Sequence, residues 1–217
     1  MRLDQYLVEE GFVDSRTKAQ VLIKERKVSV NSKPVTKPAF KITGDEKVEV
    51  AQEMIYVSRA AHKLKGFLPS LPFSPKGLDA LDIGASTGGF TQVLLEEDVK
   101  SVTCVDVGRG QLHQTLLDDR RVISFESMDI RDFSRQKRYD LITSDVSFIS
   151  LHHILESIDA LSKRWIILLF KPQFEVGKDV KRDSNGVVLD EKAIESAKKR
   201  FEEATSALGW KLVHHEP

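Results

Sequence analysis

Apolar and polar positions follow two different rhythms along the chain, and the first covers residues 1–50. Segment 3–10 has its apolar residues on one helical face, and Gly11 follows as a common helix stop. Ser15 is placed to cap a second helix with one apolar face. Short strand patterns follow at residues 28–30, 33–35 and 47–50. We therefore expect a small α+β domain at the start of the chain.

The second rhythm begins after residues 51–57, which have the composition of a linker. Ser58 is placed to cap a helix that ends near three prolines. From there strand patterns alternate with helical ones. The strand patterns are LDALDIG (78–84), SVTCVDV (101–107), VISFES (122–127), YDLITSD (139–145) and WIILLFKP (165–172). This alternation is typical of an open, doubly wound, mostly parallel sheet, so we expect an α/β, Rossmann-like domain over residues 58–217.

The composition limits the classes of protein that this chain can be. Its 217 residues are 41% hydrophobic and 30% charged, as in an ordinary globular protein. Lys plus Arg and Asp plus Glu number 33 each, so only a locally basic surface could bind nucleic acid. The apolar run at 165–170 is far shorter than the roughly 20 residues that cross a bilayer, so no membrane association is expected. The single cysteine, Cys104, fits a cytoplasmic protein, and no histidine pair indicates a metal site.

The segment ALDIGASTGGFT, residues 80–91, breaks an apolar run with small residues and could serve three chemistries. Residues 84–88 spell G-x-S-x-G, the nucleophile turn of serine hydrolases, and Asp145 and His214 or His215 follow in the matching order. Against this, the turn follows the first strand of the α/β region, whereas hydrolases have earlier strands that supply an oxyanion loop upstream. The hydrolase interpretation is therefore the weaker one.

The same segment fits a nucleoside cofactor better. A dinucleotide loop needs G-x-G-x-x-G, but Ser86 stands where the second glycine would approach a pyrophosphate. S-adenosylmethionine has no pyrophosphate and needs a turn of small residues, which D-x-G-x-x-x-G-G supplies. Asp106 ends the second strand where a carboxylate can accept hydrogen bonds from two ribose hydroxyls, although that feature alone would fit NAD equally well. Asp129 follows the third strand, near the expected adenine edge. The predicted S-adenosylmethionine site consists of Asp82, Gly84, Ser86, Gly88, Gly89, Asp106 and Asp129.

The residues after the fourth and fifth strands indicate which atom would receive a methyl group. Amino-group methyltransferases carry N-P-P-Y or D-P-P-Y after the fourth strand, whereas this chain has DVSF at 145–148. Methylation at pyrimidine carbon five needs a cysteine nucleophile, and Cys104 lies within a strand pattern. Asp145 and Lys171, with Lys63 as a second cation, favour a ribose 2′-hydroxyl instead, because a suitably placed lysine can accept or stabilise its proton. Each of the three could also be a solvated charge.

Lys and Arg are frequent in residues 16–41, where they form either a solvated helix face or a nucleic-acid surface. The string RLDQYLVEEGFVDSRTKAQVLIKERKVSVNSKPVTKPAFKI resembles the RNA-binding module of ribosomal protein S-four, with R-L-D at its start, D-S-R before a helix and a V-x-V-N turn. In that family, paired helices lay basic side chains against RNA phosphates. The resemblance places Arg2, Arg16, Lys18 and Lys33 near RNA, as contacts that position the strand without reading its sequence.

Four strings together resemble the TlyA family, also called hemolysin A: SRAAHKLKGFL, LDIGASTGGFTQVLL, YDLITSDVSFISL and LLFKPQFEVGK. That family joins the S-four-type module to an FtsJ-like domain of the class I methyltransferase fold and methylates ribosomal RNA at ribose 2′-hydroxyls of cytidine. The resemblance implies S-adenosylmethionine as cofactor, ribosomal subunits as partners and catalytic roles for Lys63, Asp145 and Lys171. A membrane-lytic protein, as the older name suggests, and an RNA-binding adaptor without catalysis are the alternatives.

The family's catalytic set is Lys-Asp-Lys-Glu, and its glutamate has no counterpart here. That glutamate lies in a final strand beyond a G-x-x-G-N-like turn, whereas this sequence ends at HHEP. Glu216 precedes the place of that turn and is not assigned to the set. We expect residues 210–215, WKLVHH, to form a strand, the strand after it to be missing, and the activity of this chain to be reduced or absent.

Overall fold

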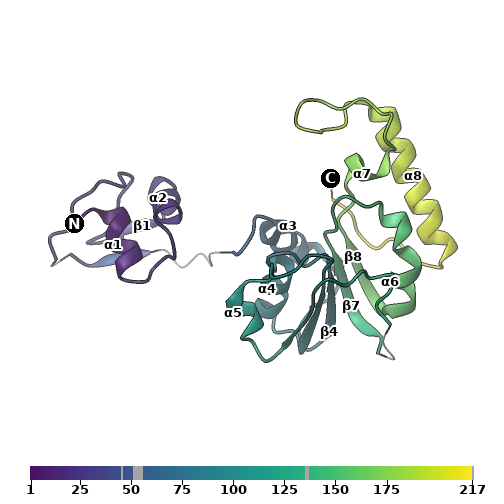
Figure 1. Ribbon diagram of the computed structural model, residues 1–217, viewed down its shortest axis with the longest axis horizontal. Helices are drawn as coiled ribbons and strands as arrows, with labels where there is room; N and C mark the ends of the chain where they lie inside the picture. Colours follow the sequence, from purple (N-terminus) through teal and green to yellow (C-terminus); the bar gives the residue numbers. More distant parts are fainter. Residues whose placement is uncertain (45, 51–55, 135–136, 217) are drawn as a thin grey trace. The chain divides into compact units, whose positions relative to one another are not determined.

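The computed structural model describes residues 1–44, 46–50, 56–134 and 137–216. The chain divides into two compact units, Met1–Ile55 and Tyr56–Pro217 (Figure 1). Each unit has its own apolar core. The two units are therefore considered one at a time. The linker predicted at 51–57 falls mostly on residues outside the described part of the chain.

The first unit is a small α+β domain. Its elements are α1 (Leu3–Glu9), α2 (Arg16–Lys24), β1 (Val28–Val30), β2 (Lys33–Pro34) and β3 (Val48–Val50). The strands form an antiparallel sheet in the order β2-β1-β3. Ser15 caps α2, because its Oγ accepts a hydrogen bond from the Lys18 amide at 3.4 Å. Leu3, Leu7 and Ile23 are fully buried in the core that the helices and the sheet share.

The second unit is built on a parallel sheet of five strands in the order β6-β5-β4-β7-β8, which confirms the predicted fold class. The strands are β4 (Asp79–Ile83), β5 (Ser101–Val105), β6 (Val122–Phe125), β7 (Tyr139–Ser144) and β8 (Ser162–Leu168). From β4 the chain adds two strands on one side and then returns to add β7 and β8 on the other. Open sheets bind ligands at the carboxyl ends of the strands beside such a reversal.

Helices cover both faces of this sheet (Figure 1). They are α3 (Ala60–Phe67), α4 (Gly89–Glu96), α5 (Gln114–Leu117), α6 (Leu155–Leu161), α7 (Pro172–Glu175) and α8 (Glu191–Ala207), with 3₁₀ turns at Leu68–Ser70 and Leu151–His153. One core joins Leu64 of α3 and Leu94 of α4 to Leu141 of β7. The other joins Ile158 of α6 to Ile142, the next residue of β7. Because successive strand residues point to opposite faces, one apolar strand serves both cores.

The strand expected at residues 210–215 does not form. The described residues of this segment pair with no strand of the sheet. Trp210 donates from Nε1 to Asp159 Oδ1 at 2.7 Å, and the ring of His214 packs on that of Phe67. Side-chain contacts, and not backbone hydrogen bonds to a strand, therefore hold this segment against the rest of the second unit.

Candidate active site

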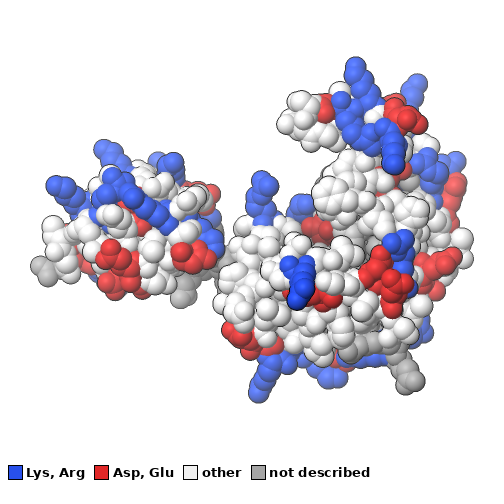
Figure 2. All heavy atoms as spheres, in the orientation of Figure 1, with Lys and Arg blue, Asp and Glu red and all other residues white. Residues whose placement is uncertain are grey.

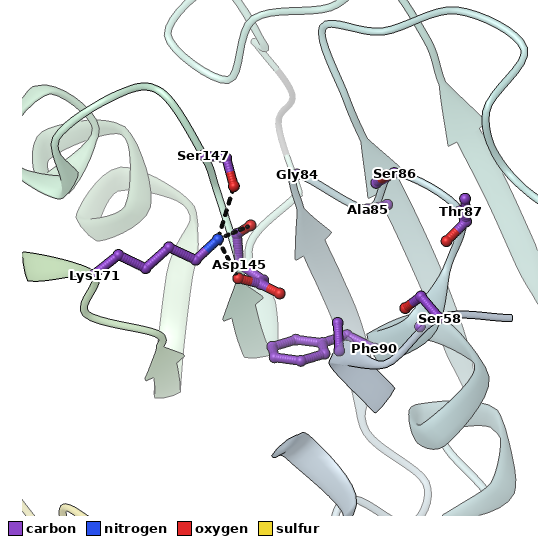
Figure 3. A pocket seen from close by; sticks show the side chains of 11 residues that line it. Ser58, Gly84, Ala85, Ser86, Thr87, Phe90, Asp145, Ser147 and Lys171 are labelled. Atoms are coloured by element: carbon purple, nitrogen blue, oxygen red, sulfur yellow. Dashed lines mark hydrogen bonds and ion pairs between the residues drawn. The ribbon is translucent and has the colours of Figure 1, made fainter. Parts of the chain in front are cut away.

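A cavity of about 180 Å³ opens where the carboxyl ends of β4 and β7 meet, beside the reversal in strand order (Figure 3). The turn after β4 forms one side of it, and the loops after β7 and β8 form the other. The beginnings of α3 and α4 complete the wall. The lining residues are Ser58, Ala60, Gly84, Ala85, Ser86, Thr87, Gly89, Phe90, Asp145, Ser147 and Lys171.

The turn after β4 contains two glycines in the left-handed region, with φ of +74° at Gly84 and +98° at Gly88. A Cβ at Gly84 would lie 3.0 Å from Cγ1 of Val146, so the missing side chain lets this turn approach the loop after β7. A Cβ at Gly88 would lie 2.2 Å from Cδ1 of Leu116 in α5. Ser86, between the glycines, has a φ of +48°. Backbone conformation and packing therefore both require small residues here.

Helix α3 is attached to α4 and supplies one wall of the cavity. The Val57 amide donates to Oε1 of Gln92 at 2.9 Å. A Cβ on Gly89, the first residue of α4, would lie 2.1 Å from Oγ of Ser58, so the two helices meet at a glycine. The prediction that Ser58 caps α3 is wrong, because the helix begins at Ala60 without a side-chain cap. The Ser58 side chain lines the cavity instead.

Asp82, predicted to bind the cofactor, lies beneath the turn and does not line the cavity. It is 1% exposed, and its carboxylate accepts hydrogen bonds from Oγ1 of Thr91 at 2.7 Å and Oγ1 of Thr143 at 2.9 Å. Burial raises the pKa of Asp82 to about 6, the two hydroxyls oppose this, and the negative charge of Asp145 adds to it. Asp82 therefore ties α4 and β7 to the central strand.

Asp82 should make the stability of the second unit depend on pH. Its pKa is about 6 in the folded chain and about 3.9 in an unfolded one, so between these values the folded state binds more protons. The free energy of unfolding contributed by Asp82 therefore falls as the pH rises from about 4 to about 6, and is constant above. Asp82→Asn should abolish this slope. Urea titrations measure the free energy of unfolding of both proteins. We expect the wild-type free energy minus that of Asp82→Asn to fall by on the order of 2–3 kcal/mol between about pH 4 and pH 6.

Asp132→Asn is the control for this measurement, because it removes an exposed carboxylate from the same unit. All three proteins are compared at one ionic strength, since salt screens an exposed charge more than a buried one. Parallel curves for the wild type and Asp82→Asn between about pH 4 and pH 6 would contradict the raised pKa of Asp82.

Asp106 and Asp129, the two other predicted cofactor carboxylates, differ in their surroundings. Asp106 follows β5, and its oxygens accept hydrogen bonds at 2.7 Å from the amides of Ser86 and Gly108. Each oxygen keeps a second lone pair for a further donor. Asp129 is paired with Arg131, whose Nε and Nη2 lie 3.0 and 2.6 Å from its oxygens. The structure therefore joins Asp106 to the turn that lines the cavity and does not bring Asp129 into it.

Lys171 and Asp145 form an ion pair on the cavity wall (Figure 3). Nζ of Lys171 lies 2.5 Å from Oδ1 of Asp145, and both side chains are 15% exposed. Nζ also donates to the main-chain oxygen of Asp145 at 3.2 Å and to Oγ of Ser147 at 2.8 Å. Solvent screens a pair in this position less than it screens a surface pair. Three oxygen atoms of the loop after β7 therefore fix the ammonium group at the cavity.

The third predicted catalytic residue, Lys63, is exposed and does not line the cavity. It lies one helical turn after Ala60, which does, so the two share a face of α3. Sequence reasoning missed Ser147, although its place two residues after Asp145 at a strand end could have indicated it. It also missed the lining role of Ser58, which depends on the contact between α3 and α4 and has no signal in the sequence.

The hydrolase interpretation fails on geometry. His214 packs on Phe67 and makes a hydrogen bond of 3.2 Å with Oε1 of Glu216. None of these three residues lines the cavity that contains Ser86 and Asp145. In the described part of the chain, the Ser-Asp-His order of the sequence does not become a catalytic triad.

The four predicted RNA-binding residues belong to the first unit. Arg2 and Arg16 converge on the carboxylate of Asp4. Lys18 pairs at 2.7 Å with the carboxylate of Asp14, just before α2. Lys33 is exposed in β2. Figure 2 shows Lys and Arg gathered over one side of this unit, with Asp and Glu concentrated on other parts of it. The structure therefore brings two of the four into one cluster.

Comparison with known proteins identifies both parts of the chain. Residues 56–217 match the family model of the FtsJ-like methyltransferases, and residues 1–48 match that of the S4 domain. The 23S rRNA (cytidine-2′-O)-methyltransferase TlyA of Campylobacter jejuni is 44% identical, over 98% of this chain and 90% of its own. Hemolysin A of Brachyspira hyodysenteriae is 40% identical, over 88% of this chain and 82% of its own.

A solved structure agrees with these matches. A candidate hemolysin from Streptococcus thermophilus is 30% identical, with a TM-score of 0.67, over 96% of this chain and 78% of that one. Proteins that carry the hemolysin name and the methyltransferase name thus match the same stretch of sequence. With an S4 domain before its methyltransferase domain, this chain belongs to the TlyA family of FtsJ-like methyltransferases.

Proposed function

We propose that this chain transfers a methyl group from S-adenosylmethionine to a ribose 2′-hydroxyl of ribosomal RNA. One observation carries the proposal: the ion pair of Lys171 and Asp145 shares a cavity with the turn of small residues after β4. The proposed place of the methyl donor thus lies next to a group that can accept a hydroxyl proton, as methyl transfer to an oxygen requires. Membership of the FtsJ-like methyltransferase family supports this assignment.

The residues around the turn fit the proposed cofactor. Gly84 has no side chain, and those of Ala85 and Ser86 are short, so a ligand can lie against the backbone. Asp106, bonded to the Ser86 amide, supplies a carboxylate for ribose hydroxyls. The volume of about 180 Å³ is below the roughly 300–1,000 Å³ that enclose a whole ligand, so the cavity would enclose only part of the cofactor. When bound, S-adenosylmethionine supplies a methyl group on a sulfonium sulfur, which a sugar oxygen can attack.

We assign to Lys171 the role of accepting the proton of the 2′-hydroxyl. The Lys171 ammonium donates two hydrogen bonds, to the main-chain oxygen of Asp145 and to Oγ of Ser147, and Oδ1 of Asp145 lies 2.5 Å away as its ion-pair partner. Since an ammonium has three N–H donors, a sugar hydroxyl that approaches the nitrogen competes with these oxygens. The hydroxyl of Ser147 can rotate away and make room for the sugar hydroxyl. Lys171 must first release one proton to solvent, and its neutral amine then accepts the proton of the 2′-hydroxyl. This transfer restores the ammonium, whose charge Asp145 balances.

The RNA substrate is inferred from a relative and from the first unit. The Campylobacter jejuni relative acts by its name on cytidine in 23S rRNA, so we propose a cytidine of ribosomal RNA. The S4 domain would bind that RNA through its backbone. Lys63, exposed one turn from the cavity, would contact a phosphate near the target sugar. Because ribosomal RNA is the proposed substrate, we propose that ribosomal subunits are the partners of this chain and that it acts in the cytoplasm.

The two alternative functions gain no support. Within the described residues, no helix has both the length and the apolar character that crossing a membrane requires. The hemolysin name belongs to a relative that aligns with the same methyltransferase sequence. The ion pair of Lys171 and Asp145 on the wall of the cavity favours an enzyme over an adaptor without catalysis.

The test of the proposed function is the transfer of tritiated methyl groups from S-adenosylmethionine to isolated ribosomal subunits, followed by nuclease mapping. We expect label in the ribose of a cytidine, and no further label in subunits already treated with this chain and unlabelled cofactor. Full transfer would contradict the reduced activity expected from the missing glutamate. Calorimetry with the cofactor alone accompanies the assay. RNA binding without cofactor binding would support the adaptor, and absence of both transfer and cofactor binding would overturn the proposal.

A further inference from the structure

Two arginines of the first unit converge on one buried carboxylate. Arg2 donates from Nε to Oδ1 of Asp4 at 2.9 Å and from Nη2 to Oδ2 at 3.1 Å. Arg16 donates from Nε to Oδ2 at 2.9 Å, and Gln20 adds a hydrogen bond of 3.0 Å to the same oxygen. The Asp4 side chain is 0% exposed, whereas those of Arg2 and Arg16 are 42% and 50% exposed. Each guanidinium therefore joins a buried anion to the surface.

Stability alone does not explain this arrangement. A buried carboxylate is costly, and an apolar residue of similar size is often at least as stabilising in such a place. Hydrogen bonds, above all from Arg2 and then from Gln20 and Arg16, outweigh the desolvation and hold the pKa of Asp4 well below its usual range. Asp4 is therefore charged throughout the physiological pH range. Its evident effect is to fix two long side chains that would otherwise be mobile.

The backbone next to this cluster is fixed as well. The Ile42 amide donates to the main-chain oxygen of Met1 at 2.8 Å, and Arg2 pairs with Lys41 in an antiparallel bridge. Residues that face each other in such a bridge carry their side chains on the same side. The exposed Lys41 therefore adds a positive charge on the same side as Arg2.

We propose that Asp4 is a positioning residue that makes Arg2 and Arg16 a clamp for one phosphate of the RNA backbone. This inference rests on the proposed function as an RNA methyltransferase. A guanidinium has five N–H donors, of which Arg2 uses two on Asp4 and Arg16 uses one, so both retain Nη donors for a ligand. Phosphate oxygens are the acceptors that this planar fork binds best. Lys18, paired with a surface carboxylate instead, has no such fixed orientation.

The first test compares Asp4→Asn with Asp14→Asn in the whole chain. Both changes remove one negative charge from the first unit, and Asp14 pairs with Lys18 on the surface. If only net charge mattered, both would strengthen RNA binding. We expect Asp4→Asn to weaken binding to a ribosomal RNA fragment about 10-fold and to reduce the slope of log K against log salt by about 1. Asp14→Asn should bind as the wild type or slightly more tightly, as measured by fluorescence anisotropy.

A second pair of variants guards against loss of folding, because Asp4→Asn also leaves the buried site without its charge. Arg16→Lys keeps the positive charge but loses the fork, since one ammonium cannot bind Asp4 and a phosphate in a fixed geometry. Arg26→Lys makes the same change at an exposed arginine outside the cluster. We expect about fivefold weaker RNA binding for Arg16→Lys and less than about twofold for Arg26→Lys.

The outcomes separate this inference from the proposed function. A purely structural defect would lower the fraction of protein that binds RNA without changing the salt slope of the rest, and would contradict the clamp. If Asp4→Asn and Arg16→Lys bind RNA like a wild type that methylates ribosomal RNA, the clamp is wrong and the function stands. If the wild type neither binds nor methylates ribosomal RNA, the proposed function falls first.

Discussion

Lys171→Met should lower the rate of methyl transfer to ribosomal RNA by about two to four orders of magnitude, the range expected when a general acid–base group is lost. Methionine has a similar length but cannot take a proton from the 2′-hydroxyl, and it leaves Asp145 without its partner. The cofactor cradle lies on the opposite side of the cavity, so the affinity for S-adenosylmethionine should change less than about threefold. Single-turnover transfer with tritiated cofactor measures the rate, and calorimetry measures the affinity.

Lys163→Met is the matched control, because Lys163 lies in β8 and pairs with Asp140 outside the cavity. It should transfer methyl groups at the wild-type rate. Lys171→Arg separates charge from proton transfer, since an arginine stays protonated at neutral pH. We expect it to be nearly as slow as Lys171→Met. A fast Lys171→Arg variant would show that the residue acts only as a fixed positive charge, and a fast Lys171→Met variant would exclude it from the chemistry.

Asp106→Ala should weaken the binding of S-adenosylmethionine about 100-fold, as expected when two hydrogen bonds to a charged group are lost. The carboxylate has two roles that the change removes together. Its free lone pairs can accept ribose hydroxyls, and its bonds to the amides of Ser86 and Gly108 hold the loop after β5 against the turn. RNA affinity should stay within about twofold, because most of the proposed RNA contacts lie in the first unit, and Lys63 lies on α3 rather than in the loop after β5. Calorimetry and fluorescence anisotropy measure the two affinities.

Asp118→Ala serves as the control, because it removes an exposed carboxylate just after α5 that bonds only a neighbouring side chain, Gln114, among the contacts of the described residues. It should leave both affinities unchanged. Equal losses of cofactor and RNA affinity in Asp106→Ala would indicate general misfolding. Unchanged cofactor affinity would remove Asp106 from the proposed site.

The sheet could be predicted from the sequence because its strands are short, apolar and separated by helical segments. Parallel strands end at one edge, so Asp145 after β7 and Lys171 after β8 could be placed near each other from strand order alone. Their 2.5 Å contact could not be predicted, because it depends on the path of two loops. The same holds for the pairing of Asp129 with Arg131.

Other features escaped prediction for identifiable physical reasons. The helix α8, Glu191–Ala207, is mostly charged and has one buried residue, Ala197, so its apolar stripe is too narrow to stand out. Residues 210–215 have the composition of a strand, but side-chain contacts of Trp210 and His214 take the place of backbone pairing. Asp82 stands beside the glycines of the turn in sequence, yet a strand residue that points into the core cannot face a ligand.

The negative charge of Asp145 contributes to the raised pKa of Asp82 below the cavity. Such an influence is mutual, so the proton on the hidden carboxyl group alters the electric field at the reacting pair. A change at Asp82 can therefore reach the reacting pair through the charge of Asp145, although Asp82 itself does not line the cavity. The interior of the sheet and the chemistry at its edge are thus electrically connected.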